Sequence, residues 1–273
     1  MTPPIQLAGV ELAHPRSTAP IVTAANLAVA AGEVVLVVGS AGLGTSRLVA
    51  AALGEVALGA GSIELLGRDV AKLRRSSLRL LRRRVGIVPQ DLCLLEDRSA
   101  QLNVVLPLEI DGIPRSVSVR RAAEVLAELH LEDEAGLPVD CLAASARQRV
   151  AVARALVRHP DLIFADHPTS AQDADGAEVV CAALAAAAKR GAACLVFGRD
   201  SRLRELADVH GWRQLALVDG TLRPLGEIEL DGRNIEDILV GIESAPTPIR
   251  PLPDAAIPNV LPFPISARTA GAR

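Results

Sequence analysis

The chain has 273 residues, of which 50% are hydrophobic and 22% are charged, and its formal net charge is −3. This length and balance suit a soluble globular protein of one or two domains. The small net charge excludes a general attraction to nucleic acid or to anionic lipid, so any basic contact has to be local.

Neither the apolar runs nor the cysteines point to a membrane span or a metal site. The longest uncharged apolar run, Val179–Ala188, is shorter than the roughly 20 residues that cross a bilayer. We therefore expect a cytoplasmic protein, and any membrane-spanning partner must be another chain. The four cysteines are scattered, and we interpret them as reduced thiols that serve in packing: Cys93, Cys141, Cys181 and Cys194.

The first 66 residues contain the pattern of a strand-rich unit with one helix. Residues 5–13 and 21–30 alternate apolar and polar positions and predict two antiparallel strands. The continuous apolar run Val34–Val38 is typical of a buried central strand. A glycine-rich turn follows, then a helical pattern at 46–53 and a further strand at 62–66.

Helical and strand patterns alternate in the second half of the chain. Residues 101–130 contain two helical patterns separated by the breaker Asp111-Gly112-Ile113-Pro114. The elements expected next are helix Arg147–Val157, strand Leu162–Ala165, helix Ala174–Lys189 and strand Ala193–Phe197. Such alternation builds a parallel sheet covered by helices. Trp212 begins another apolar strand pattern, and we expect it in the core.

The C-terminal segment 227–273 differs in composition, with seven prolines between Pro246 and Pro264. It holds too little apolar surface to order itself, so we expect a largely disordered extension. The alternative is an extended strap that docks on a neighbouring subunit.

A glycine-rich segment follows the run Val34–Val38 and opens a helix, which is the setting of a phosphate-binding loop. In such loops glycines let backbone N–H groups converge on phosphate, and the helix N-terminus adds partial positive charge. The expected nucleotide-binding residues are Gly39, Ser40, Ala41, Gly42, Leu43, Gly44, Thr45, Ser46 and Arg47. The motif requires lysine where this chain has Thr45, and losing such a contact costs about 1.5–3 kcal/mol, or about 10- to 100-fold in affinity. Arg47, two positions later, is the candidate substitute.

Further motifs agree with the loop in order and spacing. Val85–Gln90 looks like a Q-loop, Arg147–Leu156 like the helix after a signature motif, and Leu162–Ser170 like a Walker B strand; Asp173 falls at the D-loop aspartate. Over residues 4–226 the chain thus resembles the nucleotide-binding subunits of ATP-binding cassette (ABC) transporters. Within that family, the stretch Leu94–Leu108 is most similar to the cell-division and lipoprotein-release branch.

The resemblance implies an α/β fold of the P-loop NTPase type, with a mixed sheet core, an antiparallel β subdomain and a helical subdomain inserted at about 91–155. The domain would span residues 1–226. It also implies ATP and Mg²⁺ as cofactors, a head-to-tail dimer with itself or with another ABC ATPase, and a permease partner on the inner face of the cell membrane. Ser46 and Asp166 would hold the Mg²⁺, and Gln90 would contact it and sense the γ-phosphate.

Other positions depart from the family pattern. His167 replaces the glutamate that polarises the attacking water, and Arg199 replaces the switch histidine. Leu142-Ala143-Ala144-Ser145-Ala146 replaces the signature, and His14 stands where an aromatic residue stacks on adenine. We therefore expect a pseudo-ATPase. The alternatives are an active ATPase that uses Arg47, His167 or Arg199 as substitutes, and a soluble nucleotide-sensing module without a permease.

The segment Lys72–Arg84 is rich in arginine, and we interpret it as a solvated helix face before the Q-loop strand. Contact with lipid headgroups or RNA is the alternative; without interleaved aromatic residues for base stacking we expect no nucleic acid partner. His130, His159 and His210 lack metal-ligand spacing and are expected at the surface or at helix ends.

Overall fold

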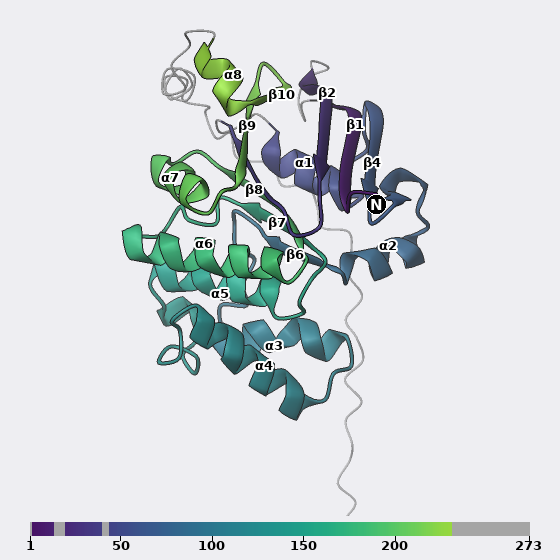
Figure 1. Cartoon of the computed structure of the whole chain (residues 1–273). Helices are drawn as coiled ribbons and strands as arrows, with labels where there is room; N and C mark the ends of the chain where they lie inside the picture. Colours follow the sequence, from purple (N-terminus) through teal and green to yellow (C-terminus); the bar gives the residue numbers. More distant parts are fainter. Residues whose placement is uncertain (1, 14–19, 40–43, 231–273) are drawn as a thin grey trace, which may run out of the picture.

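The computed structural model of the protein describes residues 2–13, 20–39 and 44–230. A small antiparallel sheet lies beside a larger mixed sheet, and helices pack around the larger sheet (Figure 1). The expected α/β architecture, with a mixed sheet, an antiparallel sheet and an added group of helices, is confirmed.

The antiparallel sheet has the strand order β2-β1-β4-β5. Its strands are β1 (Ile5–Ala13), β2 (Pro20–Val29), β4 (Ala60–Leu65) and β5 (Arg68–Asp69). Strands β1 and β4 approach closely at a pair of glycines, since a Cβ on Gly61 would lie 2.2 Å from the carbonyl oxygen of Gly9. The two strands expected here from alternation, and the further strand expected at 62–66, are confirmed within two residues.

The mixed sheet has the order β10-β9-β3-β8-β7-β6, in which only β10 runs antiparallel to its neighbour. Its strands are β3 (Val34–Val38), β6 (Val85–Val88), β7 (Leu162–Asp166), β8 (Ala193–Gly198), β9 (Arg213–Val218) and β10 (Thr221–Pro224). Every residue of β3, β7 and β8 is buried, as their continuous apolar runs predict.

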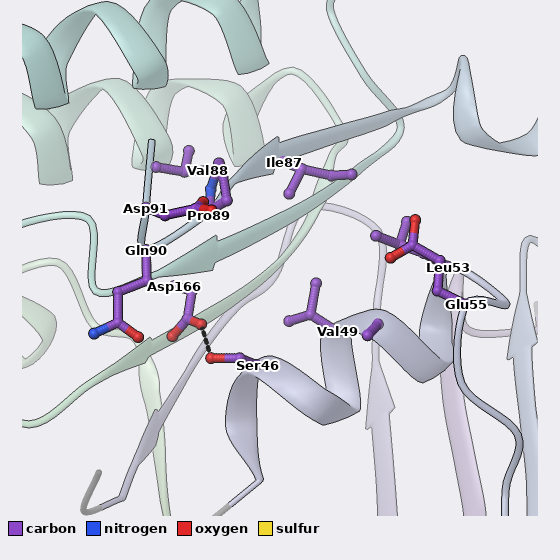
Figure 2. A pocket seen from close by; sticks show the side chains of 11 residues that line it. Ser46, Val49, Leu53, Glu55, Ile87, Val88, Pro89, Gln90, Asp91 and Asp166 are labelled. Carbon is purple, nitrogen blue, oxygen red and sulfur yellow. Dashed lines mark hydrogen bonds between the residues drawn. The ribbon is translucent and has the colours of Figure 1, made fainter. Parts of the chain in front are cut away.

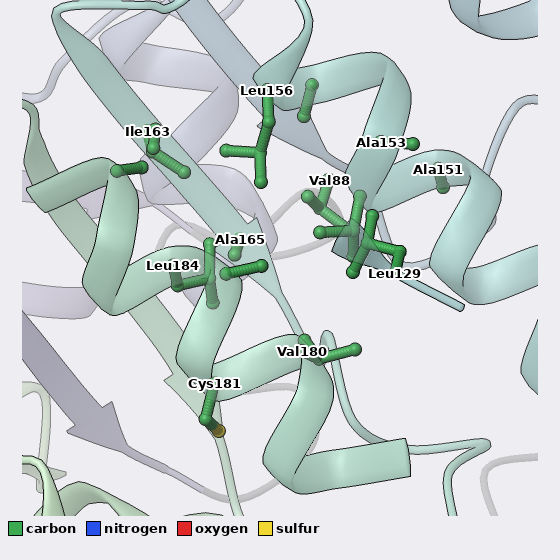
Figure 3. Close-up of a cluster of buried hydrophobic side chains, with 14 of the residues drawn as sticks. Val88, Leu129, Ala151, Ala153, Leu156, Ile163, Ala165, Val180, Cys181 and Leu184 are labelled. Carbon is green, nitrogen blue, oxygen red and sulfur yellow. The ribbon is translucent and has the colours of Figure 1, made fainter. Parts of the chain in front are cut away.

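Successive residues of the central strand serve two separate cores. Val34, Leu36 and Val38 pack in a cluster with the helices of one face, part of which Figure 3 shows around α5 and α6. Val35 and Val37 point the other way, into a cluster shared with α1 and the antiparallel sheet. The central strand is therefore covered on both faces, and its carboxyl end is the part left free for a site.

The helices complete the domain. They are α1 (Thr45–Ala52), α2 (Arg75–Arg82), α3 (Ala100–Ile110), α4 (Arg115–Glu128), α5 (Ala144–Leu156), α6 (Ala174–Lys189), α7 (Ser201–Val209) and α8 (Leu225–Leu230), with short 3₁₀ turns at Val70–Lys72 and Val139–Cys141. In Figure 1, α3 and α4 lie next to α5 at the bottom of the molecule, away from the antiparallel sheet. The domain boundary expected after residue 226 falls inside α8, and the extension beyond residue 230 lies outside the described residues.

The expectation that all four cysteines serve in packing is wrong for two of them. Cys181 and Cys194 are buried, whereas Cys93, before α3, and Cys141, between α4 and α5, are exposed. Trp212 is buried as expected and stacks on His210, the C-cap residue of α7; His130 and His159 are exposed. Within the ranges that the structure describes, no helix has the length and apolar character needed to cross a bilayer.

Candidate functional site

The site forms where strands β3 and β7 end at the same edge of the mixed sheet. Both strands pair in parallel with β8, so their carboxyl ends lie close together. Asp166 is the last residue of β7, and Ser46 is the second residue of α1, the helix that follows β3. The hydroxyl of Ser46 donates a hydrogen bond to Oδ2 of Asp166, as Figure 2 shows. The contact joins two of the three side chains that the family resemblance implies as metal ligands.

The second carboxylate oxygen of Asp166 is buried and has no hydrogen-bond partner within the described part of the chain. The whole residue is only 5% exposed. A buried acceptor without a partner is costly, so it indicates a place for a ligand atom or for water. Mg²⁺ prefers oxygen ligands, and the carboxylate of Asp166, the hydroxyl of Ser46 and the amide of Gln90 supply ligands of this kind.

Gln90 lies two residues beyond the end of β6 and is exposed. Together with Ser46 and Asp166 it lines a cleft of about 700 Å³ between α1 and the segment after β6 (Figure 2). Apolar side chains, among them Val49 and Ile87, form much of the wall. The three residues predicted to hold the metal and sense the γ-phosphate are therefore brought into one cleft.

His167 follows Asp166 directly and lies at the edge of the site. Its Nε2 is 3.9 Å from the unpartnered Oδ1 of Asp166, and its side chain is 13% exposed. The backbone of His167 has a φ of 52°, and its N–H donates to the carbonyl of Phe197 at 2.8 Å. The left-handed backbone turns the chain sharply at the end of β7, and the imidazole stands where the family pattern has a carboxylate.

The remaining expected site residues are only partly described. Gly39 is buried after β3, and Gly44 caps α1 with a φ of 92°, where a Cβ would meet Ile21 at 2.8 Å. Thr45 and Arg47 are half-buried in α1, and Arg199 is exposed after β8; none of the three lines the cleft. The other predicted residues lie outside the described ranges: His14, Ser40, Ala41, Gly42 and Leu43.

The helix α5 contributes a buried glutamine that the sequence analysis did not identify. Gln148 is 3% exposed, and its Nε2 donates to the carbonyl of His167 at 2.9 Å and to Ser170 Oγ at 3.0 Å. Its Oε1 accepts from the N–H of Ala171 and from Gln172 Nε2, each at 3.0 Å. This side chain therefore fixes the segment after Asp166 to the helix. A single glutamine inside a helix gave no sequence signal for such a role.

The segment corresponding to the signature lies at the start of α5. Ala143 is the N-cap residue, and the cap makes no side-chain hydrogen bond. The carbonyl of Ser145 accepts a hydrogen bond from Gln172 Nε2 at 2.8 Å, so this segment is linked to the one that follows β7. The alanine leaves the first turn of the helix without a hydroxyl cap.

A second side-chain contact holds the segment that follows Gln90. Leu92 and Cys93 both have positive φ angles, 59° and 47°, which non-glycine residues seldom adopt. The guanidinium of Arg154 donates to both of their carbonyl oxygens, at 2.5 and 2.6 Å. Burial lowers the pKa of Arg154 from its usual value. The arginine thus stabilises an unusual turn directly after the expected Q-loop.

The comparisons with known proteins agree with this geometry. The ABC transporter family model matches residues 22–170. The methionine import ATP-binding protein MetN of Brucella abortus (strain 2308) is 36% identical over 159 residues, which cover 58% of this chain and 43% of the relative. MetN of Caulobacter vibrioides is 37% identical over 161 residues, covering 59% and 48%. The chain thus matches less than half the length of these curated relatives.

Solved structures give the same architecture. The dimeric structure of MJ0796, a bacterial ABC transporter cassette, superposes with a TM-score of 0.73 and 26% identity, over 80% of this chain and 96% of that one. A structure of MJ0796 bound to ADP and Pi gives a TM-score of 0.72.

The comparisons also bear on the branch of the family. The stretch Leu94–Leu108 favoured the cell-division and lipoprotein-release branch, but the curated relatives above are methionine import proteins, so they do not support that assignment. A short stretch in the helical region is a weaker guide than an alignment of about 160 residues. Because the family model matches more than half of its length, the chain belongs to the ABC transporter family.

Proposed function

We propose that this protein is the ATP-binding subunit of a membrane complex of the ABC type, and that it hydrolyses ATP weakly or not at all. It would act on the cytoplasmic face of the membrane, docked on a permease, as a dimer with itself or with another ABC ATPase. The names of its relatives favour an import complex.

The observation that carries the proposal is the residue after Asp166. In a hydrolysing site this position holds a carboxylate that polarises the attacking water, and here it is His167, 3.9 Å from the Asp166 carboxylate. Thr45 stands where the motif has lysine, so the phosphate site also lacks that positive charge. Arg199 is exposed and does not line the cleft. Phosphoryl transfer depends on several groups positioned together, so these changes act in combination.

The groups that bind the nucleotide are better preserved than those that cleave it. Ser46, Gln90 and Asp166 share one cleft, and the buried Oδ1 of Asp166 lacks a partner. When bound there, Mg²⁺ would neutralise phosphate charge. The backbone turn at Gly44 places the start of α1 at the cleft, where its N-terminal N–H groups favour an anion. We therefore expect the protein to bind ATP and to hydrolyse the bound ATP slowly or not at all.

A groove of about 380 Å³ supports the docking of a permease. It lies between β6 and the helices α3 and α5, and is lined by Pro107, Arg154 and Arg158, among others. Gly86 in this groove cannot carry a side chain, because a Cβ would lie 2.5 Å from the carbonyl of Ala155. The groove opens beside Pro89, next to Gln90, so a helix from a partner seated in it would contact the segment that reaches the nucleotide cleft.

Binding and hydrolysis need separate tests. Calorimetric titration with Mg-ATP should show weak binding by the native protein and about 10- to 100-fold tighter binding by Thr45→Lys. Phosphate release, measured alone and with the permease, should stay close to the level of the Asp166→Asn variant. Hydrolysis at about 1 s⁻¹ or faster that Asp166→Asn abolishes would contradict the proposal.

The alternative, an active ATPase, is favoured by one observation. Arg47 follows Ser46 directly in α1, and its buried Nε has no hydrogen-bond partner in the described residues, a feature that Arg147, Arg149 and Arg204 share. If Arg47 replaces the missing lysine, Arg47→Ala should remove Mg-ATP binding. Unchanged affinity in that variant would eliminate this substitution.

A further inference from the structure

The helix α2 presents a basic face that the site described above does not use. We define this basic face of α2 as Arg74, Arg75, Arg79 and Leu80. All four residues are exposed, and Leu80 is the most exposed large apolar side chain of the helix, at 60%. Leu81, the next residue of the helix, is buried at 4%. In Figure 1, α2 lies at the right edge of the molecule, away from α6 and α7.

The arginines of this face are not neutralised by neighbouring acids. Within the described residues, Arg74, Arg75 and Arg79 make no ion pair. The acidic groups nearby are already paired with other basic residues: Glu55 with Arg82 at 3.6 Å, Asp69 with Lys72 at 2.8 Å and Asp111 with Arg83 at 3.4 Å. Three unpaired cations therefore face solvent on a protein whose net charge is −3.

The position of α2 on the domain indicates which way the basic face of α2 would be turned in a complex with a permease. Arg82, the last residue of the helix, lines the groove beside β6 that we propose for the permease. The basic face lies on the same helix, so it flanks that groove. A subunit seated with the groove toward the membrane would present these arginines to the lipid headgroups beside the permease.

We propose that the basic face of α2 binds the anionic lipid surface of the membrane. Arginine guanidinium groups pair with lipid phosphate, and an exposed leucine among them can enter the headgroup region. Nucleic acid is a poorer fit, because the face carries no aromatic side chain for base stacking. Each arginine near an anionic surface contributes about fivefold in affinity, so three give about 100-fold, enough to orient a subunit that the permease already holds.

This inference goes beyond the proposed function, because vesicle binding requires neither a permease nor a nucleotide. The test is co-sedimentation of the full chain with vesicles of phosphatidylglycerol and phosphatidylcholine, against pure phosphatidylcholine. Binding should need the anionic lipid and should weaken from about 0.1 M to about 1 M salt, as the Debye length falls from about 10 to about 3 Å. A triple variant with Arg74→Gln, Arg75→Gln and Arg79→Gln should bind about 100-fold more weakly.

A charge-matched control separates this face from the total charge. Arg98→Gln, Arg115→Gln and Arg120→Gln together also take the formal net charge from −3 to −6, but these exposed residues lie outside α2. This control should bind like the native chain. Equal loss in both triple variants, equal binding to neutral vesicles, or no binding to anionic vesicles would each overturn the proposal.

A tryptophan placed on the basic face of α2 would report whether this face contacts the lipid. In Leu80→Trp, the new indole should shift its emission to shorter wavelength on addition of anionic vesicles, whereas the natural Trp212, only 7% exposed, should not respond. Tighter binding of a single-stranded RNA oligomer than of anionic vesicles, with the indole shift appearing only with the RNA, would assign the face to nucleic acid instead.

Discussion

The hydroxyl of Ser46 at the start of α1 donates a hydrogen bond to Oδ2 of Asp166 at the end of β7, 120 positions later in the sequence. This contact ties the helix that follows the glycine-rich turn to β7, a buried strand of the mixed sheet. It satisfies one carboxylate oxygen of Asp166 and leaves the other, Oδ1, buried without a partner. The geometry leads to a testable coupling between the two residues.

A double-mutant cycle with Ser46→Ala and Asp166→Asn should detect that coupling. A hydrogen bond to a charged group contributes about 1.5–3 kcal/mol, so we expect a coupling free energy of about 1–3 kcal/mol in urea unfolding. Ser46→Ala alone should destabilise the protein, because the carboxylate loses its donor. Additive effects, within about 0.3–0.5 kcal/mol, would mean that the two side chains are not joined in solution.

Gln148 should be the most sensitive polar residue near the site. Gln148→Leu removes both the donor to the carbonyl of His167 and the acceptor for the N–H of Ala171. We expect a loss of about 2–4 kcal/mol in the free energy of unfolding, because buried polar groups are left unsatisfied. Gln6→Leu on the half-buried side of β1 is the control and should change stability by less than about 0.5 kcal/mol. Equal effects of the two changes would contradict the role given to Gln148.

The position of the site, at the carboxyl ends of buried parallel strands, could largely be predicted from the sequence. Val34–Val38 and Leu162–Ala165 are continuous apolar runs, and such runs form buried parallel strands. The resemblance to ABC ATPases implies that Ser46 and Asp166 hold one Mg²⁺ and so lie close together, and the sheet accounts for this, because residues that follow parallel strands meet at one edge. The structure places them in hydrogen-bond contact.

The contacts that hold the site could not be predicted in the same way. Gln148 lies between two arginines in the sequence and has the local pattern of a solvated helix position, yet it is buried. The positive φ angles of Leu92 and Cys93 depend on Arg154, about 60 residues away. Both features arise only when α5 packs against segments distant in sequence, and periodicity carries no information about such packing.

A helix cap offers a simple gain in stability. Ala143 is the N-cap of α5 and makes no side-chain hydrogen bond. Ala143→Ser should add about 1 kcal/mol, raising the melting temperature by about 2–4 °C, because the hydroxyl can accept from an N–H of the first turn. Ala144→Ser, one residue into the helix, is the matched control and should give no gain. If both variants behave alike, the start of α5 differs from the described cap.

The two buried thiols should make the protein less stable in alkali. Burial raises the pKa of Cys181 and of Cys194 from 9.0 to about 12. Unfolding restores the ordinary pKa, so above about pH 9 the unfolded chain loses protons that the folded chain retains. The stabilising contribution of each thiol is complete below pH 9 and falls by about 1.4 kcal/mol per pH unit as the pH rises toward 12.

Urea midpoints measured at pH 8 and at pH 10.5 should show this fall, and Cys194→Ala should reduce the difference by about half, whatever its effect at pH 8. Cys93→Ala is the comparison: its pKa is also raised, mainly by the hydrogen bond to Asp91, but the thiol is exposed and solvent screens that interaction, so its removal should reduce the difference much less. The same slope in Cys194→Ala and in the native chain would show that other groups cause the alkaline loss. Labelling gives an independent check, since two thiols should react quickly in the folded protein and two only after unfolding.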